Sequence, residues 1–384
     1  MNGQRIYLDN AATSWPKPDA VYYAVDNYQR HNGAAAGRGA YRSAQSAERI
    51  VSQCRKRCAD LIGAATPQQI IFTLNGTDAL NLALHGLLRD GDHLVTSVCE
   101  HNSVLRPLHA LRQARSITFD AVGCDAQGFI DPDDIRRAVT ARTRLIALTH
   151  ASNVTGAVQP LAEVGRIAAE RNVLFLVDAA QSLGHLALSV KELGCHLLAA
   201  PGHKGLLGPL GTGILYLAEE VKTELRPLRQ GGTGTRSDDP QQPATLPERF
   251  ESGNLNVPGI VGLNAGIGWL HEQGLTAFHK QELQLRELLL QSLSEIPGVT
   301  IYGPQTNQPA VGLVSFNIAG FDPQEVAAAL DSAAGIEVRS GLHCAPLMHA
   351  GLGTAPGGAV RVSFGPFTTA GDIAAVSAAV RDFV

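Results

Sequence analysis

Residues 195–217 read CHLLAAPGHKGLLGPLGTGILYL and place a single lysine between an apolar run and a cluster of glycines. The "LLAA" before Lys204 is typical of the end of a buried strand, and "GPLGTG" after it is typical of a tight turn. Lysine side chains usually lie on polar surfaces, where their charge stays hydrated. Lys204 therefore lies either at an exposed loop tip or in a pocket, where burial lowers the pKa of its amine and makes it a nucleophile.

Short apolar strands alternate with helical patterns on the N-terminal side of this stretch. Strands are indicated at 69–73, 93–98, 143–150 and 173–178, with helical spacing of leucines between them. This alternation predicts βαβ units and a mostly parallel sheet with helices on both faces, the α/β class. Ligands of such sheets bind outside the carboxyl ends of the strands. Polar residues cluster there at 73–77, 100–101, 150–153, 178–181 and 202–204.

The pattern changes after a Gly/Pro-rich segment at residues 228–254. Two helical stretches, about 257–273 and 275–296, lead into short strands with fewer helices between them, which predicts a smaller α+β domain. A loop as long as 228–254 is usually functional. We place the large domain at 15–259 and the small domain at 1–14 together with 260–384.

Composition excludes several classes of protein. The chain has 384 residues, of which 45% are hydrophobic and 17% charged, so it can bury a large core. Its net charge of −4 and lack of a basic block argue against a nucleic-acid-binding protein. Its apolar runs are too short to cross a bilayer. The N-terminal "MNGQRIYLDNAATS" has no charged-then-apolar leader, so we expect no signal peptide and a cytoplasmic location.

Six cysteines are scattered along the chain rather than arranged in a framework. We expect free thiols in a reducing compartment. Cys54 and Cys58 share a helix face, but no second pair or nearby histidine completes a ligand set. We therefore predict packing roles for both and no metal site.

A carboxylate and a lysine at neighbouring strand ends suggest a cofactor. Asp178 ends the most apolar strand, where a carboxylate is either satisfied by helix amides or paired with a cation. Lys204 follows about one βα unit later. This pair suits pyridoxal 5'-phosphate, whose ring nitrogen an aspartate keeps protonated and whose aldehyde forms a Schiff base with a lysine.

Two further sites on the same sheet edge have both a plain and a functional interpretation. Gly76 and Thr77 come just before a helix, where backbone amides bind a phosphate, although Thr77 alone is more simply a helix cap. His101 is either a satisfied core histidine or a ring that stacks on the cofactor.

The second domain contributes two candidates of its own. Cys344 lies on a turn beside His343, with Arg339 nearby, a better position for ionisation and attack than for burial. Arg361 is either a plain edge-strand arginine or a fork that binds a substrate carboxylate.

Nine motifs together resemble the class V aminotransferase superfamily of fold-type I pyridoxal-phosphate enzymes, and within it the short-loop cysteine desulfurases. They run almost from end to end, at 7–13, 76–81, 100–103, 152–156, 177–182, 202–213, 249–254, 339–346 and 361–367. The resemblance implies a seven-stranded large-domain sheet. It also implies a homodimer whose active site borrows the partner's segment around Gly253 and Asn254.

The resemblance assigns a role to each matching residue. Lys204 would bind the cofactor and act as the base, Cys344 would accept sulfur, and His101 would stack on the ring and relay protons. The cofactor site would comprise Gly76, Thr77, His101, Asn153, Asp178, Gln181, His203, Lys204 and Asn254. The substrate site would comprise Asn10, Asn153, Arg339 and Arg361, with Arg361 on the carboxylate.

This sequence departs from the family pattern at three positions. Pro201 and Asn254 stand where relatives often have hydroxyl residues that bind phosphate, which would weaken the hold on that group. Tyr41 replaces a histidine that is common near the substrate, and this leaves the fine substrate preference open.

The resemblance implies conversion of L-cysteine to L-alanine, with the sulfur left on Cys344 as a persulfide and then passed to an acceptor protein. Three alternatives remain open from the sequence. The chain could be a selenocysteine lyase, a class V aminotransferase, or a cofactor-binding sulfur-transfer partner with weak turnover.

Overall fold

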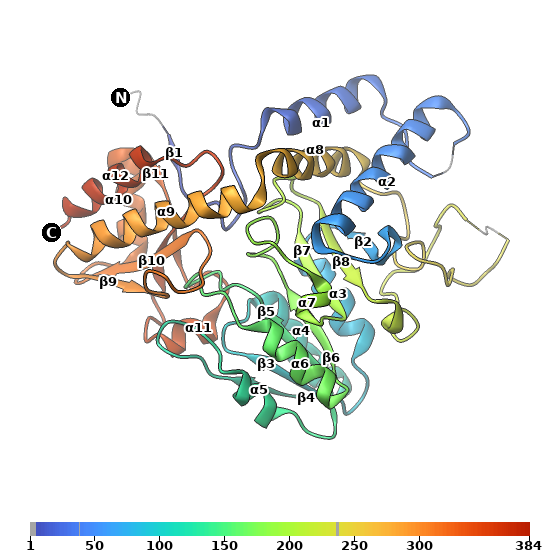
Figure 1. Cartoon of the computed structure of the whole chain (residues 1–384), viewed down its shortest axis with the longest axis horizontal. Helices are drawn as coiled ribbons and strands as arrows, with labels where there is room; N and C mark the ends of the chain where they lie inside the picture. The colour runs from blue at the N-terminus through green and yellow to red at the C-terminus, as the bar shows by residue number, and fades with distance from the viewer. Residues whose placement is uncertain (1–4, 38, 236–237) are drawn as a thin grey trace.

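The computed structural model describes residues 5–37, 39–235 and 238–384, and its largest element is a seven-stranded sheet (Figure 1). The strand order is β2-β8-β7-β6-β5-β3-β4, and all neighbours pair in parallel except β8, which runs antiparallel to β2 and β7. The predicted mostly parallel α/β sheet is confirmed. Its strands are β2 (Ile70–Thr73), β3 (His93–Ser97), β4 (Thr118–Val122), β5 (Thr143–Thr149), β6 (Leu174–Asp178), β7 (Leu197–Pro201) and β8 (Gly213–Leu217).

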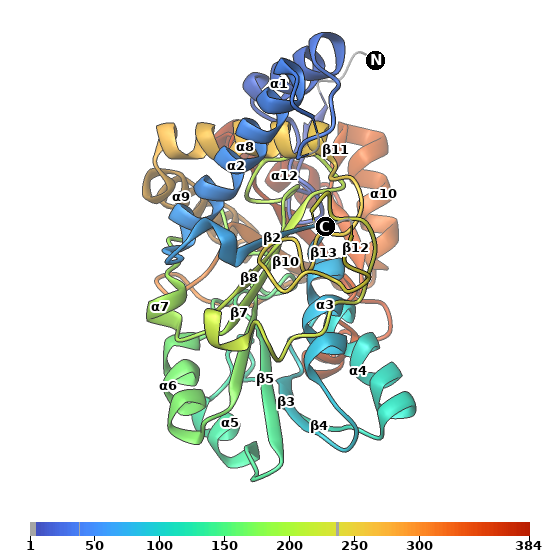
Figure 2. The same ribbon diagram turned by 90° about the vertical axis from the view of Figure 1, so that its right-hand side faces the viewer.

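Helices cover both faces of this sheet (Figure 2). On one side lie α3 (Gly76–Leu87) and α4 (Asn102–Arg115), and on the other lie α5 (Pro132–Ala138), α6 (Leu161–Arg171) and α7 (Val190–Leu193). Every residue of β2 and β7 is buried. Because both faces of the sheet are covered, the sequences of these strands are continuous apolar runs and do not alternate between apolar and polar residues.

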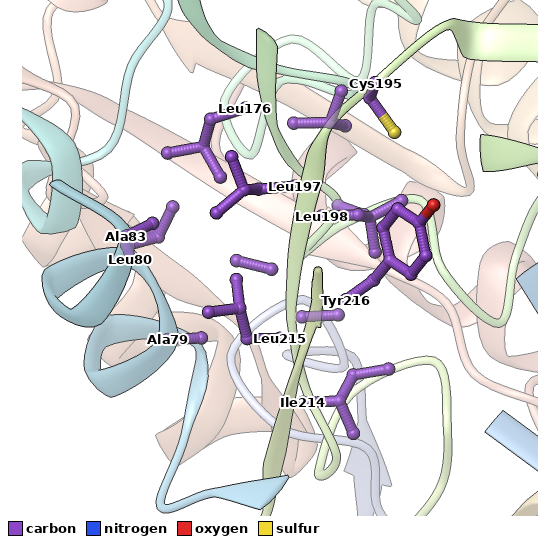
Figure 3. Packing of buried hydrophobic residues seen from close by; sticks show 14 of the residues in the cluster. Ala79, Leu80, Ala83, Leu176, Cys195, Leu197, Leu198, Ile214, Leu215 and Tyr216 are labelled. Atoms are coloured by element: carbon purple, nitrogen blue, oxygen red, sulfur yellow. The ribbon is translucent and has the colours of Figure 1, made fainter. Parts of the chain in front are cut away.

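The packing of α3 shows how the strands divide their side chains between the two faces (Figure 3). Successive side chains of a strand point to opposite faces. Leu197 and Leu215 therefore face α3, whereas their neighbours Leu198 and Tyr216 lie on the far side. Strand β7 ends at Pro201. The chain therefore leaves the sheet at its carboxyl edge just before Lys204.

A second, antiparallel sheet forms a separate core, and the predicted smaller α+β unit is observed. Its order is β12-β13-β10-β9, and a short parallel pair, β1 with β11, brings residues 6–7 to this unit. The strands are β1 (Ile6–Tyr7), β9 (Val299–Tyr302), β10 (Leu313–Ile318), β11 (Ile336–Glu337), β12 (Arg339–Gly341) and β13 (Ala359–Ser363). The helices are α9 (Leu275–Ser294), α10 (Pro323–Ala334), α11 (Pro346–Gly351) and α12 (Ala370–Arg381).

Three more helices pack together at the end of the large sheet where β2 lies (Figure 1). They are α1 (Asp19–His31), α2 (Arg42–Ile62) and α8 (Val257–Gln273), and single 3₁₀ turns occur at Pro67–Gln69 and Glu219–Val221. Our division of the chain at 259/260 falls inside α8 and stays a proposal. The described part of 228–254 forms no helix or strand. Among the described residues, no helix combines the length and apolar character needed to span a membrane.

Candidate active site

A cavity of about 310 Å³ opens at the carboxyl edge of the large sheet. Thr149, Asp178 and Pro201, which end β5, β6 and β7, all contribute to its wall. Eight of the nine predicted cofactor residues line it: Gly76, Thr77, His101, Asn153, Asp178, Gln181, His203 and Lys204. The structure thus brings together side chains that lie up to 128 positions apart in the chain (204 − 76).

Lys204 lies in this cavity and not at a loop tip. The turn that carries it is closed by Gly202, whose amide donates to Thr212 O at 2.8 Å and whose carbonyl accepts from Gly208 N at 2.7 Å. Burial is the main cause that lowers the pKa of Lys204 to about 8, and Arg361 lowers it further while Asp178 opposes the shift. With this lowered pKa, a larger fraction of the Lys204 amine is neutral at neutral pH. The amine is therefore more available as a nucleophile and base than that of a surface lysine.

Asp178 is buried in the wall of the same cavity, close enough to affect the pKa of the Lys204 amine. Its Oδ1 accepts from Ala180 N at 2.9 Å. Burial raises the pKa of Asp178, whereas the amide of Ala180 and the charge of Lys204 lower it. The carboxylate is therefore held in place by the backbone and is available to a cationic or N–H group in the cavity.

His101 is fixed as a neutral ring by the start of α4. It is the N-cap of that helix, and its Nδ1 accepts from Ser103 N at 3.0 Å. Burial, then the charge of Lys204, lowers the pKa of His101 to about 4. Since Nδ1 accepts a hydrogen bond, the single ring proton of the neutral form lies on Nε2.

The helix α3 begins two residues earlier than the sequence predicted, at Gly76 instead of Asp78. Gly76 and Thr77 lie inside its first turn, and the N-cap is Asn75, whose side chain accepts from Asp78 N at 2.9 Å. The simpler interpretation of Thr77 as the cap is therefore wrong. Its hydroxyl instead lies 2.8 Å from Ser103 Oγ, which joins the starts of α3 and α4 at the cavity wall.

These residues fit pyridoxal 5'-phosphate by their chemistry. Asn75 occupies the amides of Asp78 and Ala79, which leaves those of Gly76 and Thr77 at the start of α3 for an anion. A Cβ at Gly76 would lie 3.1 Å from Pro201 Cδ, so glycine keeps this helix start close to the end of β7. His203 Nδ1 is buried without a hydrogen-bond partner among the described residues, as expected for a group that awaits a ligand.

Two arginines from the small domain lie side by side near Lys204, although neither is part of the cavity wall. Arg339 in β12 is directly opposite Arg361 in β13, so both side chains lie on the same face of the antiparallel sheet. Arg361 is buried, and its guanidinium donates to Asp9 Oδ1 at 2.7 Å and to Asn153 O at 3.0 Å. Its Nε has no partner in the described ranges. Both arginines lower the pKa of Lys204, which places their positive charge near the amine.

Cys344 lies on an exposed turn that is anchored next to His101. Asn102 N donates to Cys344 O at 2.7 Å, and Asn153 Nδ2 donates to His343 O at 2.6 Å. All six cysteines belong to the described residues, and Cys344 is the only exposed one. Cys54 and Cys58 are buried in the large core, in agreement with the predicted packing role.

The Aminotransferase class-V family model matches residues 6–376. The chain belongs to this family. It is 41% identical over 374 residues to a probable cysteine desulfurase of Methanothermobacter thermautotrophicus, covering 96% of this chain and 92% of the relative. It is 36% identical over 357 residues to a cysteine desulfurase of Dickeya dadantii, covering 91% and 85%. The apo structure of cysteine desulfurase from Thermococcus onnurineus superposes with a TM-score of 0.93 at 36% identity, covering 99% and 94%. The predicted cysteine desulfurase family is thereby confirmed.

Besides Arg339, Arg361 and Cys344, two more predicted site residues of this class-V family member, Asn10 and Asn254, lie outside the cavity wall, and Gln181 in the wall is already hydrogen-bonded. Asn254 is exposed and lines a separate groove of about 1180 Å³ between α2 and the segment 232–255. Asn10 is buried, and its side chain bonds to the backbone groups Tyr7 O, Ser363 O and Trp15 N. Gln181 lines the cavity, but its Nε2 donates to Ala11 O at 2.9 Å. Their assigned roles stay predictions.

Sequence reasoning missed residues that position the site without a motif of their own. Ser103 connects Thr77 to His101, and Asp9 pairs with Arg361. Glu100 is fully buried beneath the site, where burial raises its pKa to about 8. Glu100 and Ser103 lie within "EHNS" and Asp9 within "YLDNAAT". The motifs thus pointed to these segments, but they did not show which residues contact each other.

Proposed function

We propose that this chain is a pyridoxal 5'-phosphate-dependent cysteine desulfurase that converts L-cysteine to L-alanine and takes the sulfur onto Cys344. One observation carries the proposal: Lys204 and Asp178 share a cavity, and the residue that carries the exposed thiol, Cys344, is held by its backbone carbonyl at the start of α4 beside that cavity. A plain aminotransferase needs the first feature but not the second.

Each group around the cavity has a defined task. When bound, pyridoxal 5'-phosphate supplies an electron sink for the pair released at the substrate Cα. Lys204, with its lowered pKa, removes the Cα proton as a general base. Asp178 would hold the ring nitrogen, and the first turn of α3 with His203 would hold the phosphate. Arg361 and Arg339 bind the substrate carboxylate, for which paired guanidinium groups are suited.

Cys344 performs the sulfur step. Its thiolate attacks the substrate sulfur, the S–Cβ bond breaks with its electron pair left on carbon, and an S–S bond forms on Cys344. The two thiols supply two protons. One takes the place of the sulfur on Cβ, and the other protonates the persulfide. L-cysteine plus the Cys344 thiol thus becomes L-alanine plus the Cys344 persulfide, with carbon reduced and sulfur oxidised. His101, whose Nε2 carries a proton, is positioned to return one of these protons.

Association and location complete the proposal. We propose a homodimer in which the partner's segment around residues 253–254 completes each site, because Asn254 is exposed and lies outside its own cavity. The persulfide would pass to an acceptor protein at the exposed turn of Cys344. A cytoplasmic location fits the free thiols, all of which remain unpaired in the structure.

Mass spectrometry of the cofactor-loaded protein tests this function. After incubation with L-cysteine, the peptide that contains Cys344 should gain one sulfur atom, and alanine should appear. Cys344→Ser should lose alanine formation, while Lys204→Ala should lose both alanine and the covalently bound cofactor. If Cys344→Ser still forms alanine at the wild-type rate, the sulfur step is wrong, and unmodified Cys344 with pyruvate as product would indicate a lyase of another kind.

A further inference from the structure

The turn that carries Cys344 has a backbone conformation that needs support. His343 has φ +48° and Cys344 has φ +59°, and they are the only consecutive non-glycine pair with positive φ in the described ranges. A left-handed backbone conformation is unfavourable for any residue other than glycine, because Cβ then lies too close to the following carbonyl oxygen. Two in a row therefore persist only where the surroundings hold them.

The two carbonyls of this turn are held by the large domain. Asn153 Nδ2 donates to His343 O at 2.6 Å, and Asn102 N donates to Cys344 O at 2.7 Å. These bonds fix the peptide groups but leave the His343 side chain to be placed by other contacts.

Helix α11, directly after the turn, provides that contact. His343 Nδ1 lies 3.2 Å from His349 Nε2, and His349 Nδ1 lies 2.7 Å from Thr354 Oγ1. His349 is completely buried and His343 almost so. The loop after the helix is tied back to it, because Thr354 N donates to His349 O at 2.9 Å.

Both imidazoles are neutral at physiological pH. Burial lowers the pKa of His349 to about 4, and burial with the charge of Arg361 lowers that of His343 still further. A neutral imidazole has one N–H and one lone pair, so the contact of the two rings is a hydrogen bond rather than a repulsion of charges. A buried hydrogen bond of this kind restricts the ring to one orientation.

We propose that His349, oriented by Thr354, is a positioning residue that fixes the His343 ring and so keeps the Cys344 turn in its left-handed conformation. The role of this conformation in sulfur uptake rests on the proposed function. Within the described part of the chain, the hydrogen bonds of His349 reach His343 and Thr354 but neither Lys204 nor Asp178, so its loss should slow the thiol step and spare the proton transfer at Cα.

Two pairs of variants separate this role from general stability. His349→Leu removes both hydrogen bonds, whereas His349→Gln keeps an amide near the position of Nε2. Thr354→Val removes only the hydroxyl at nearly constant volume, and Thr354→Ser restores it. The Thr354 pair keeps the proposal testable if His349→Leu does not fold.

Three rates are measured on the cofactor-loaded proteins. The first is exchange of the Cα hydrogen of L-alanine with deuterium from solvent, which needs Lys204 but no thiol. The second is single-turnover formation of the Cys344 persulfide from L-cysteine. The third is alkylation of Cys344 by iodoacetamide, followed by peptide mapping. We expect His349→Leu and Thr354→Val to slow persulfide formation about tenfold or more and to change the alkylation rate, with exchange unchanged and recovery in His349→Gln and Thr354→Ser.

Two results would overturn the positioning role. One is a parallel fall of exchange and persulfide formation, which indicates a general structural effect. The other is wild-type persulfide and alkylation rates in all four variants. Failure of the proposed function gives a different pattern, in which wild-type protein exchanges the alanine hydrogen but forms no persulfide. In that case the alkylation rates still decide whether His349 holds the turn.

Discussion

At the scale of single residues, the lowered pKa of Lys204 makes a direct prediction about cofactor uptake. Only the neutral amine forms a covalent bond with an aldehyde, and a pKa of about 8 instead of 10.5 makes that form abundant at lower pH. The rate at which apo protein takes up pyridoxal 5'-phosphate should therefore rise with pH and level off just above about 8. Borohydride trapping with peptide mapping at each pH measures it.

Lys204→Ala is the control for this experiment, because it should show no trapped adduct on the peptide of residues 202–208. A rate that continues to climb toward pH 10 would mean that the amine behaves as an ordinary surface lysine. Burial and the charges of Arg361 and Arg339 would then not lower the pKa of Lys204.

At the scale of elements, the turn after β7 depends on a glycine. A Cβ at Gly202 would lie 2.9 Å from Thr212 Cβ, and Thr212 is buried with its hydroxyl bonded to Pro209 O at 2.6 Å. Because Thr212 has no room to move, Gly202→Ala should destabilise the fold by about 1–3 kcal/mol. It should also weaken cofactor retention, since it displaces the turn that carries Lys204.

Gly351 provides a matched control at the end of α11. A Cβ there meets no atom within 4 Å, and alanine favours helix. Gly351→Ala should leave the free energy of unfolding unchanged or raise it by up to about 1 kcal/mol. Urea denaturation of both variants compares them, and equal stability of the two would contradict the close packing at Gly202.

The elements also show what the sequence could and could not predict. The strand ends and their polar clusters followed from local periodicity, which placed Asp178 and Lys204 on one edge before any contact was known. The pairing of β1 with β11 and the bond between Asp9 and Arg361 did not follow, because these partners lie more than 300 positions apart. Thr77 was open to misinterpretation because Asn75, an equally good cap, stands two residues before it.

At the scale of the whole molecule, the proposed homodimer predicts complementation between two defective chains. Lys204→Ala disables the site of its own chain, whereas a bulky Asn254→Trp should disable the site of the partner subunit if that is where the exposed segment reaches. In a mixed dimer, one site then carries both substitutions and the other carries neither. Co-expressed with different affinity tags and purified by both, the mixed dimer should recover up to half of the wild-type alanine formation.

The parent homodimers set the baseline for this comparison. Each should be nearly inactive, provided that Asn254→Trp retains the fold, which circular dichroism checks. If Asn254 instead served its own chain, both sites of the mixed dimer would be defective, and its activity would equal the mean of the two parents. Recovery would place Gly253 and Asn254, at the end of the long loop 228–254, in the neighbouring active site, which agrees with their exposure and with their absence from the wall of their own cavity.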